Sequence, residues 1–187
     1  MTADRDTASR GAGGAVGSML AVAITLAACV GLLTAGHALL ALEEVELEEV
    51  APELEDALKE VFADATEFTA FEHDDRMVYR AIENGDHIGS AAIAEGEGYG
   101  GPIETLIGVD TEGSVVGVKV LDHDETPDLG DVVAEDEFLS RFHGKSEADP
   151  VRIDEDIDNI TGATESAEAV AEAVRAALAH LADAENG

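Results

Sequence analysis

The sequence lacks the residues from which many redox and metal sites are built. Cys29 is the only cysteine among 187 residues, which excludes an internal disulfide and a site ligated by several cysteines, such as an iron–sulfur cluster. Tryptophan is absent, and there are only 10 Lys and Arg residues against 42 Asp and Glu, for a formal net charge of −32. A chain this acidic repels the phosphates of nucleic acids, so we exclude nucleic acid as a partner.

The acidic excess has two interpretations. Asp and Glu are spread along the chain and lysine is scarce, which favours the solvated surface of a halophilic protein over a face for a basic protein partner. In molar salt the Debye length is about 3 Å, so the self-repulsion of such a surface is largely screened. We therefore expect the isolated domain to lose structure on dilution from molar salt, as measured by circular dichroism. An unchanged spectrum in dilute buffer would contradict the halophilic interpretation.

One apolar segment is long enough to cross a membrane. Residues 15–42 carry no charge, and as a helix they extend about 42 Å, whereas the hydrocarbon core is roughly 30 Å thick. Arg5 and Arg10 precede the segment, and acidic residues follow it from Glu43 onwards. The positive-inside tendency predicts a single-pass protein of the cell membrane, with a cytoplasmic N-terminus at 1–14, a transmembrane helix at 15–42 and an extracytoplasmic C-terminal domain.

Two alternatives for this segment remain open. A cleaved signal peptide has an apolar core of about 7–15 residues, which is shorter than the run seen here. The residues up to Cys29 resemble a lipobox, in which Cys29 would be lipidated, but Val30 to Leu42 stays apolar where a lipoprotein has a polar tether. Both comparisons favour the anchoring helix.

An acidic linker at 43–51 leads into a domain at 52–187. Hydrophobic spacing predicts three helices with short strands between the first two, and Asn84-Gly85-Asp86 is a hairpin turn signal. Because strands and helices mix without strict βαβ alternation, we predict an α+β fold, a mixed sheet-and-helix domain. The expected helices span 53–65, 132–142 and 165–182, and the expected strands begin at Phe68 and Phe71 and span 77–82, 88–94, 103–109 and 114–121.

The most informative stretch is D-N-I-T-G-A-T at 158–164, which runs into a helical pattern. It places the Thr164 hydroxyl at a helix start, where free backbone N–H groups favour a phosphate. Gly162 and Ala163 leave room for a bulky phosphorylated group or a second protein. The stretch matches D-x-[IV]-[ST]-G-A-[TS], the sequon at which flavin transferases esterify a threonine with the phosphate of FMN. The alternative is that Thr164 only caps the helix, a role that contributes about 1 kcal/mol.

Four further motifs precede the sequon in a fixed order. They are G-Y-G-G-P-I at 98–103, a hairpin with Gly108, Asp110, Gly113 and Gly117, H-D-E-T-P-D-L-G at 123–130, and F-H-G-K at 142–145. Together, over about residues 90–180, they resemble the extracytoplasmic FMN-binding domain of the Rnf G subunit and the Nqr C subunit. The chain departs from that family at Asp128, where the family has glycine, at Glu165, which is usually apolar, and at Ala167, which replaces a serine.

The resemblance implies the roles of the site residues. FMN would be bound covalently through Thr164 by a separate flavin transferase, and Thr161, Gly162 and Ala163 would serve recognition by that transferase. One loop would line the flavin ring, and Tyr99 would stack on the ring. Lys145 would pair with the phosphate. The residues of that loop are His123, Glu125, Thr126, Leu129 and Gly130. Each role has a simpler alternative. Residues 161–163 would form only a helix-entry turn, and the loop at 123–130 would be a polar turn set by Pro127. Tyr99 would pack in the core, and Lys145 would be an ordinary surface lysine.

The resemblance also implies the function. We expect a membrane-anchored electron-transfer subunit of an Rnf-type ion-translocating oxidoreductase complex, which works with other subunits and is not catalytic alone. The alternatives are the C subunit of a sodium-translocating NADH:quinone reductase, a stand-alone exported flavin carrier, and a cofactor-free acidic binding module tethered to the membrane. No metal site is expected, because the acidic run at 154–158 lacks the glycine and terminal glutamate of a calcium loop.

Overall fold

The computed structural model describes residues 50–127 and 130–186. The predicted transmembrane helix at 15–42, the segment at 1–14 and most of the linker at 43–51 lie outside this part of the chain, and so do Cys29 and Leu129. Within the described part, no helix is long and apolar enough to cross a membrane.

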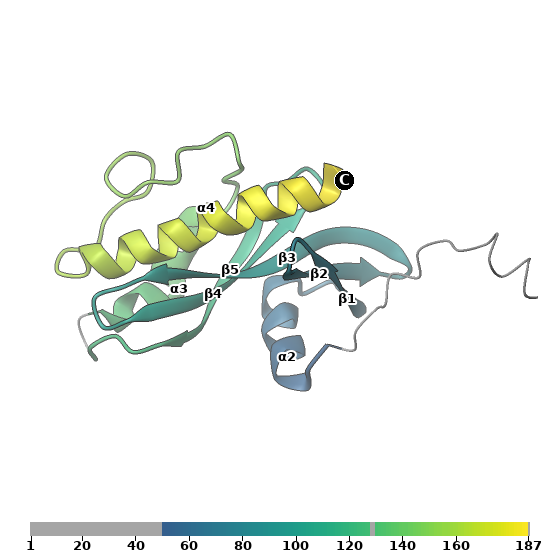
Figure 1. Ribbon diagram of the computed structural model, residues 1–187, viewed down its shortest axis with the longest axis horizontal. Helices are drawn as coiled ribbons and strands as arrows, with labels where there is room; N and C mark the ends of the chain where they lie inside the picture. The colour runs from purple at the N-terminus through teal and green to yellow at the C-terminus, as the bar shows by residue number, and fades with distance from the viewer. Residues whose placement is uncertain (1–49, 128–129, 187) are drawn as a thin grey trace, which may run out of the picture. The chain divides into compact units, whose positions relative to one another are not determined.

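Five antiparallel strands form one sheet in the order β1-β2-β3-β4-β5 (Figure 1). The β2–β3 hairpin turns at Asn84 and Gly85, whose φ angles of 52° and 94° are those of the left-handed region that this dipeptide tolerates. The predicted turn is therefore confirmed, and it sets the register that pairs Glu83 with Asp86. The strands are β1 Glu67–His73, β2 Arg76–Glu83, β3 Asp86–Glu97, β4 Pro102–Asp110 and β5 Val115–His123.

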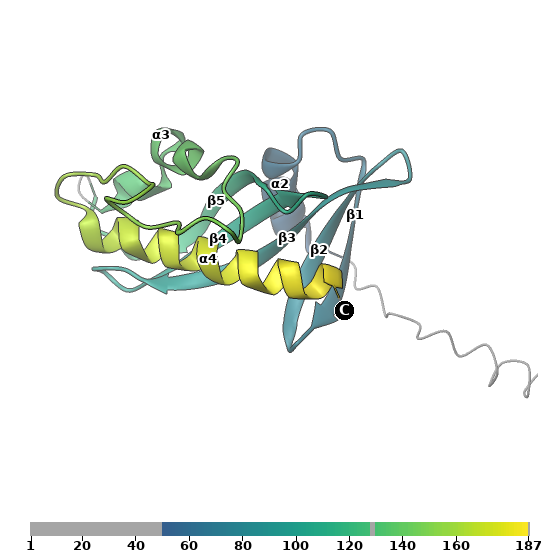
Figure 2. The same ribbon diagram turned by 90° about the horizontal axis from the view of Figure 1, so that it is seen from above.

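Helix α4 (Thr164–Asn186) packs along one face of the sheet over β3 and β4 (Figures 1 and 2). Its buried face is rich in alanine, and such small side chains let the helix approach the strands closely. Gly96 on β3 makes the closest approach, since a Cβ placed there would lie 2.0 Å from the backbone oxygen of Ala169. This contact holds the start of α4 beside the end of β3, next to the loop that joins β3 to β4.

Helix α2 (Pro52–Val61) packs near the sheet on the side away from α4 (Figure 1). Pro52 stands at its first position, where the missing N–H costs nothing. Leu58 and the following Phe62 are buried in a second apolar cluster, together with Ala81, Ala91 and Leu106. Helices thus cover both faces of an antiparallel sheet, and this mixture of sheet and helices confirms the predicted α+β class.

The segment predicted as one helix at 132–142 is broken into three short pieces. They are η1 Asp131–Ala134, α3 Asp136–Leu139 and η2 Ser140–Phe142. The prediction of a single helix was wrong because Glu135 is extended, with φ −76° and ψ 142°. Val133, Phe138 and Phe142 are buried, as their spacing predicts. They belong to three separate short helical segments, however, and not to one face of a continuous helix.

His180 near the end of α4 makes the folded state sensitive to acid. The residue is 4% exposed, and its Nε2 has no hydrogen-bond partner among the described residues. Burial lowers the pKa of His180 below its usual value of 6.5, and the charges of Arg76 and His73 lower it further against those of Asp74 and Asp183. A group whose pKa is lower in the folded than in the unfolded chain stabilises the fold fully above the unfolded pKa. That contribution is lost as the pH falls below 6.5.

The expected result is a urea midpoint that falls between about pH 7.5 and about pH 5.5 at constant high salt. The fall should be smaller in His180→Leu, which has no titrating group at this position. Equal falls in the two proteins would assign the pH dependence to other groups.

A pocket at the start of helix α4

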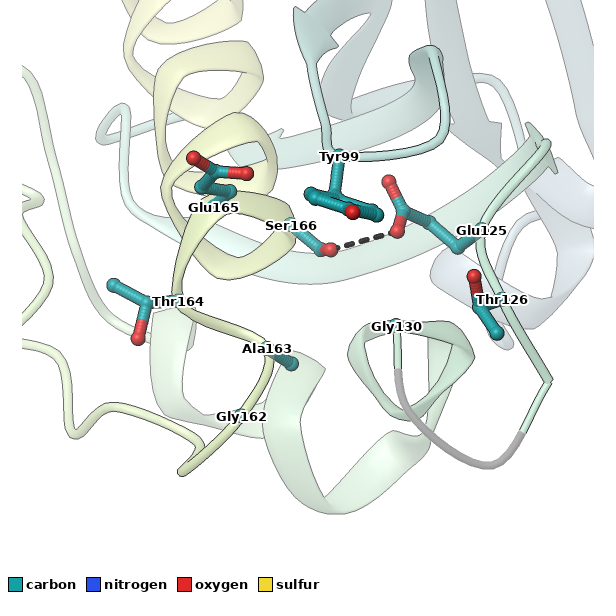
Figure 3. Close-up of a pocket in the computed structure, with 9 residues that line it drawn as sticks. All are labelled: Tyr99, Glu125, Thr126, Gly130, Gly162, Ala163, Thr164, Glu165 and Ser166. Carbon is teal, nitrogen blue, oxygen red and sulfur yellow. Dashed lines mark hydrogen bonds between the residues drawn. The ribbon is translucent and has the colours of Figure 1, made fainter.

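A pocket of about 270 Å³ opens at the N-terminal end of α4. This volume is close to the lower end of the range for small-molecule sites, about 300–1,000 Å³. Three segments line it: the β3–β4 loop, the loop that follows β5, and the first turn of α4 with the residues before it (Figure 3). The lining residues are Tyr99, Glu125, Thr126, Gly130, Gly162, Ala163, Thr164, Glu165 and Ser166.

The chain enters α4 through a tight turn. Gly162 has φ 91°, in the left-handed region that favours glycine, and the N–H of Ala163 donates to the Ile160 carbonyl at 3.1 Å. The Ala163 carbonyl then accepts the N–H of Ala167 at 2.9 Å, so the helix starts here. Ala163 has no side-chain oxygen with which to cap the helix, and the first amides of α4 are available to an anionic group at the positive end of the helix.

Thr164 is exposed, and its hydroxyl is held by Asn159. Asn159 Nδ2 donates to Thr164 Oγ1 at 3.2 Å and to Asp154 Oδ2 at 3.1 Å, while Asn159 Oδ1 accepts the N–H of Ile160 at 2.7 Å. These partners fix which end of the amide faces the threonine. Thr164 Oγ1 is therefore an acceptor towards Asn159, and its hydrogen is left to point elsewhere. Because Thr164 is already the first residue of α4, its hydroxyl contacts a loop side chain instead of capping the helix.

Arg141 holds the backbone that leads to this turn. Its Nη1 donates to the Asp158 carbonyl at 2.6 Å and to the Asn159 carbonyl at 3.4 Å. Its guanidinium lies 5.5 Å from the centroid of the Phe138 ring, a cation–π distance. Neither Arg141 nor Asn159 was predicted as a site residue from the sequence, because neither role follows from a local motif.

Glu125 lies at the bottom of the pocket and is 7% exposed. Its Oε2 accepts a hydrogen bond from the Ser166 hydroxyl at 2.8 Å (Figure 3). Its Oε1 accepts the N–H of Gly100 at 3.1 Å. Ser166 is itself 1% exposed. The carboxylate is thus bonded both to the first turn of α4 and to the loop that carries Tyr99.

Tyr99 stands at the edge of the pocket and is 74% exposed, so it does not fill the core. In the view of Figure 3, its ring lies just above the hydrogen bond between Ser166 and Glu125. Thr126 also lines the pocket and is exposed. An exposed aromatic ring next to a helix N-terminus suits a flat, phosphorylated ligand, because the ring can stack and the helix amides can bind the phosphate.

Of the predicted site residues that the structure describes, three are not in the lining of the pocket. Thr161 is exposed on the turn before Gly162. His123 supports the loop, since its Nδ1 accepts the N–H of Glu125 at 3.2 Å. Lys145 pairs with Asp156, with Nζ and Oδ2 3.0 Å apart.

Asp156 organises the loop that precedes the site. Its carboxylate accepts the N–H groups of Val151 at 3.2 Å and Arg152 at 2.7 Å in addition to the contact with Lys145. Burial acts to raise the pKa of Asp156, but the hydrogen bonds from Arg152 and Lys145 outweigh it and hold the pKa below its usual 3.8. Lys145 therefore has a structural partner in this loop.

The region of the chain that forms this pocket resembles known proteins. Residues 98–179 match the FMN-binding domain family. The matched segment begins at the Tyr99 loop and includes every residue that lines the pocket. Together with the geometry of the pocket, it supports FMN as the ligand.

The curated relatives are, by name, subunits of ion-translocating oxidoreductase complexes. The G subunit of the ion-translocating oxidoreductase complex of Aliivibrio fischeri (strain MJ11) is 40% identical over 112 residues, which cover 54% of this chain and 53% of that protein. The G subunit of the proton-translocating ferredoxin:NAD(+) oxidoreductase complex of Clostridium ljungdahlii is 35% identical over 106 residues, which cover 54% and 57%. The chain spans about half the length of these relatives, and the resemblance seen in its sequence is confirmed.

Among solved structures, the crystal structure of Shewanella oneidensis NqrC is similar to this chain with a TM-score of 0.48. The two are 22% identical, and the match covers 60% of this chain and 65% of that one.

Proposed function

We propose that this chain is the electron-transferring G subunit of an Rnf-type ion-translocating oxidoreductase complex, with FMN esterified to Thr164. The matched FMN-binding segment and the relatives named as G subunits support the proposal. The single observation that carries the covalent attachment is the exposed Thr164 hydroxyl at the uncapped start of α4, with its oxygen held by Asn159 and its hydrogen free. The same relatives favour an Rnf-type G subunit over the C subunit of an NADH:quinone reductase.

The ester would form by displacement at phosphorus. Thr164 Oγ1 bonds to the FMN phosphorus of FAD, the phosphoanhydride bond breaks, AMP leaves with the bonding electron pair, and the hydroxyl proton passes to a base of the transferase. Gly162 is exposed and has no side chain, which would leave room for a transferase beside Thr164. The amides at the start of α4 would hold the phosphodiester and stabilise its charge.

The flavin would supply the reversible electron chemistry, and the protein supplies binding and orientation. Tyr99 offers a face for the flavin ring, and Thr126 offers a hydroxyl in the lining of the pocket. Covalent attachment suits a domain outside the cell, because a cofactor that dissociates there is lost. We propose, as the sequence predicts, that residues 15–42 anchor the domain in the membrane beside the other subunits of the complex.

The test is the mass of one peptide. Trypsin should release residues 153–175, since Arg152 and Arg175 are consecutive cleavage sites. In protein from cells that contain the flavin transferase, we expect this peptide to carry the mass of FMN minus water, with fragment ions that place it on Thr164 and not on Thr161 or Ser166. A bare peptide from such cells would refute covalent attachment, and flavin released by denaturation of that protein would then indicate non-covalent FMN.

A further inference from the structure

The buried carboxyl group of Glu125 has no basic partner among the ion pairs of the described residues. Burial of a charged or polar group is costly unless hydrogen bonds replace its hydration. Here two donors do so, one on each carboxylate oxygen: the Ser166 hydroxyl at 2.8 Å and the Gly100 amide at 3.1 Å. The position of Glu125 is further fixed through its own N–H, which donates to His123. The side chain is therefore held by partners in the protein.

Two glycines make the space that this carboxylate occupies. A Cβ placed at Gly98 would lie 2.3 Å from Glu125 Oε1, and a Cβ at Gly130 would lie 2.2 Å from Glu125 Oε2. Both distances are far shorter than van der Waals contact. The absence of side chains at Gly98 and Gly130 therefore makes room for the Glu125 carboxylate.

Three segments meet at this one side chain. Ser166 belongs to the first turn of α4, two residues after Thr164, so its hydrogen bond fixes how that turn is rotated about the helix axis. Gly100 follows Tyr99, so the second hydrogen bond fixes the loop that carries the aromatic ring. Glu125 itself precedes Thr126 on the third segment (Figure 3). The carboxylate joins the acceptor hydroxyl, the stacking face and the rim of the pocket into one arrangement.

We propose that Glu125 is a positioning residue for the esterification of Thr164, and that Ser166 is its partner in this role. The inference rests on the proposed function. It differs from the role that the family resemblance implies, in which Glu125 lines the flavin ring, because both carboxylate oxygens are hydrogen-bonded within the protein and the residue is almost fully buried. The role of Glu125 is to hold the first turn of α4 against the Tyr99 loop before the transferase arrives.

The experiment compares four variants of the full-length chain, coexpressed with an active flavin transferase. Glu125→Gln can keep both hydrogen bonds, because its oxygen accepts from Gly100 and its NH₂ donates to the Ser166 oxygen. Glu125→Ala removes both bonds and Ser166→Ala removes one. Glu168→Gln is the matched control, an exposed glutamate on the same helix. The readouts are the rate at which Thr164 is esterified, from intact mass, and hydrogen exchange of residues 98–101 and 124–127 in protein made without the transferase.

Glu125→Gln and Glu168→Gln are expected to stay within about twofold of wild type in both readouts. Glu125→Ala and Ser166→Ala should slow esterification by about tenfold or more, because a buried donor or acceptor is left unsatisfied and the first turn of α4 is released. Glu125→Ala should also speed exchange at residues 98–101 by about tenfold, because the Gly100 amide loses its acceptor.

Two results would overturn the proposal. One is slow esterification in Glu125→Gln with exchange like wild type, which would mean that the charge of Glu125 acts on the flavin or its donor. The other is a wild-type rate in Ser166→Ala. If Glu125→Ala fails to fold, the results for Glu125→Gln and Ser166→Ala still test the proposal. If wild-type protein is never esterified, the proposed function fails, and faster exchange in Glu125→Ala but not in Glu125→Gln would still show that the carboxylate fixes the Tyr99 loop.

Discussion

Thr164→Ala is expected to carry no covalent flavin at all, whereas Thr164→Ser keeps a measurable fraction of it. Alanine removes the only oxygen that the proposed ester can use at this position, so the loss is complete and not a matter of affinity. Serine retains the oxygen and can still accept from Asn159, but without the methyl group its rotamer is less restricted. In-gel flavin fluorescence after denaturation, followed by intact mass, measures both effects.

The control for this substitution is Thr111→Ala, an exposed threonine in the β4–β5 turn. It should be labelled like wild type. Persistent fluorescence in Thr164→Ala would move the attachment to another hydroxyl, with Thr161 and Ser166 as the candidates to examine. Asn159→Asp gives a further check, because it replaces the donor to Thr164 by a carboxylate next to Asp154. Its labelling should be slower than that of wild type but not absent.

Gly96→Ala should destabilise the domain by about 3 kcal/mol, at the upper end of the usual cost of overpacking. The added methyl group would lie 2.0 Å from the backbone oxygen of Ala169 and 2.6 Å from its carbonyl carbon. These are backbone atoms in the second turn of α4, so no side chain can rotate away, and the helix itself must shift from the sheet. The measurement is the free energy of unfolding from urea denaturation at constant high salt.

The matched control is Glu95→Ala on the same strand, where the side chain is exposed. Its effect should stay within about 0.5 kcal/mol of wild type. Because α4 starts at the pocket, Gly96→Ala should also lower esterification of Thr164 in whatever fraction remains folded. A stability equal to that of the control would mean that the helix can move aside at little cost.

Much of the fold follows from local patterns in the sequence. Asn84 and Gly85 predict the turn at which the β2–β3 hairpin reverses, because few other residues adopt positive φ angles at consecutive positions. The alanine and valine spacing predicts the last helix, which the structure extends at its C-terminal end to Asn186. The strands of the β4–β5 hairpin lie within a residue or two of the expected positions. These elements were predictable because their signals repeat over several residues.

The parts that were not predicted depend on contacts between distant segments. Glu125 and Ser166 are 41 residues apart, and nothing in either local sequence shows that they share a hydrogen bond. The break at Glu135 is also invisible, since the apolar spacing around it fits a continuous helix. Thr164 was predicted as the acceptor from the sequon alone, but Asn159, which holds its oxygen, occupies a position that the motif leaves free.

The hydrogen bond from Asn159 to Thr164 has a consequence for the loaded protein. Esterification removes the hydrogen of the threonine and leaves its oxygen, and it is the oxygen that Asn159 contacts. The bond can therefore persist unchanged when a phosphate replaces the hydrogen. If FMN is esterified to Thr164 as proposed, this contact needs no new partner, and we expect residues 154–164 to keep the same conformation before and after cofactor attachment.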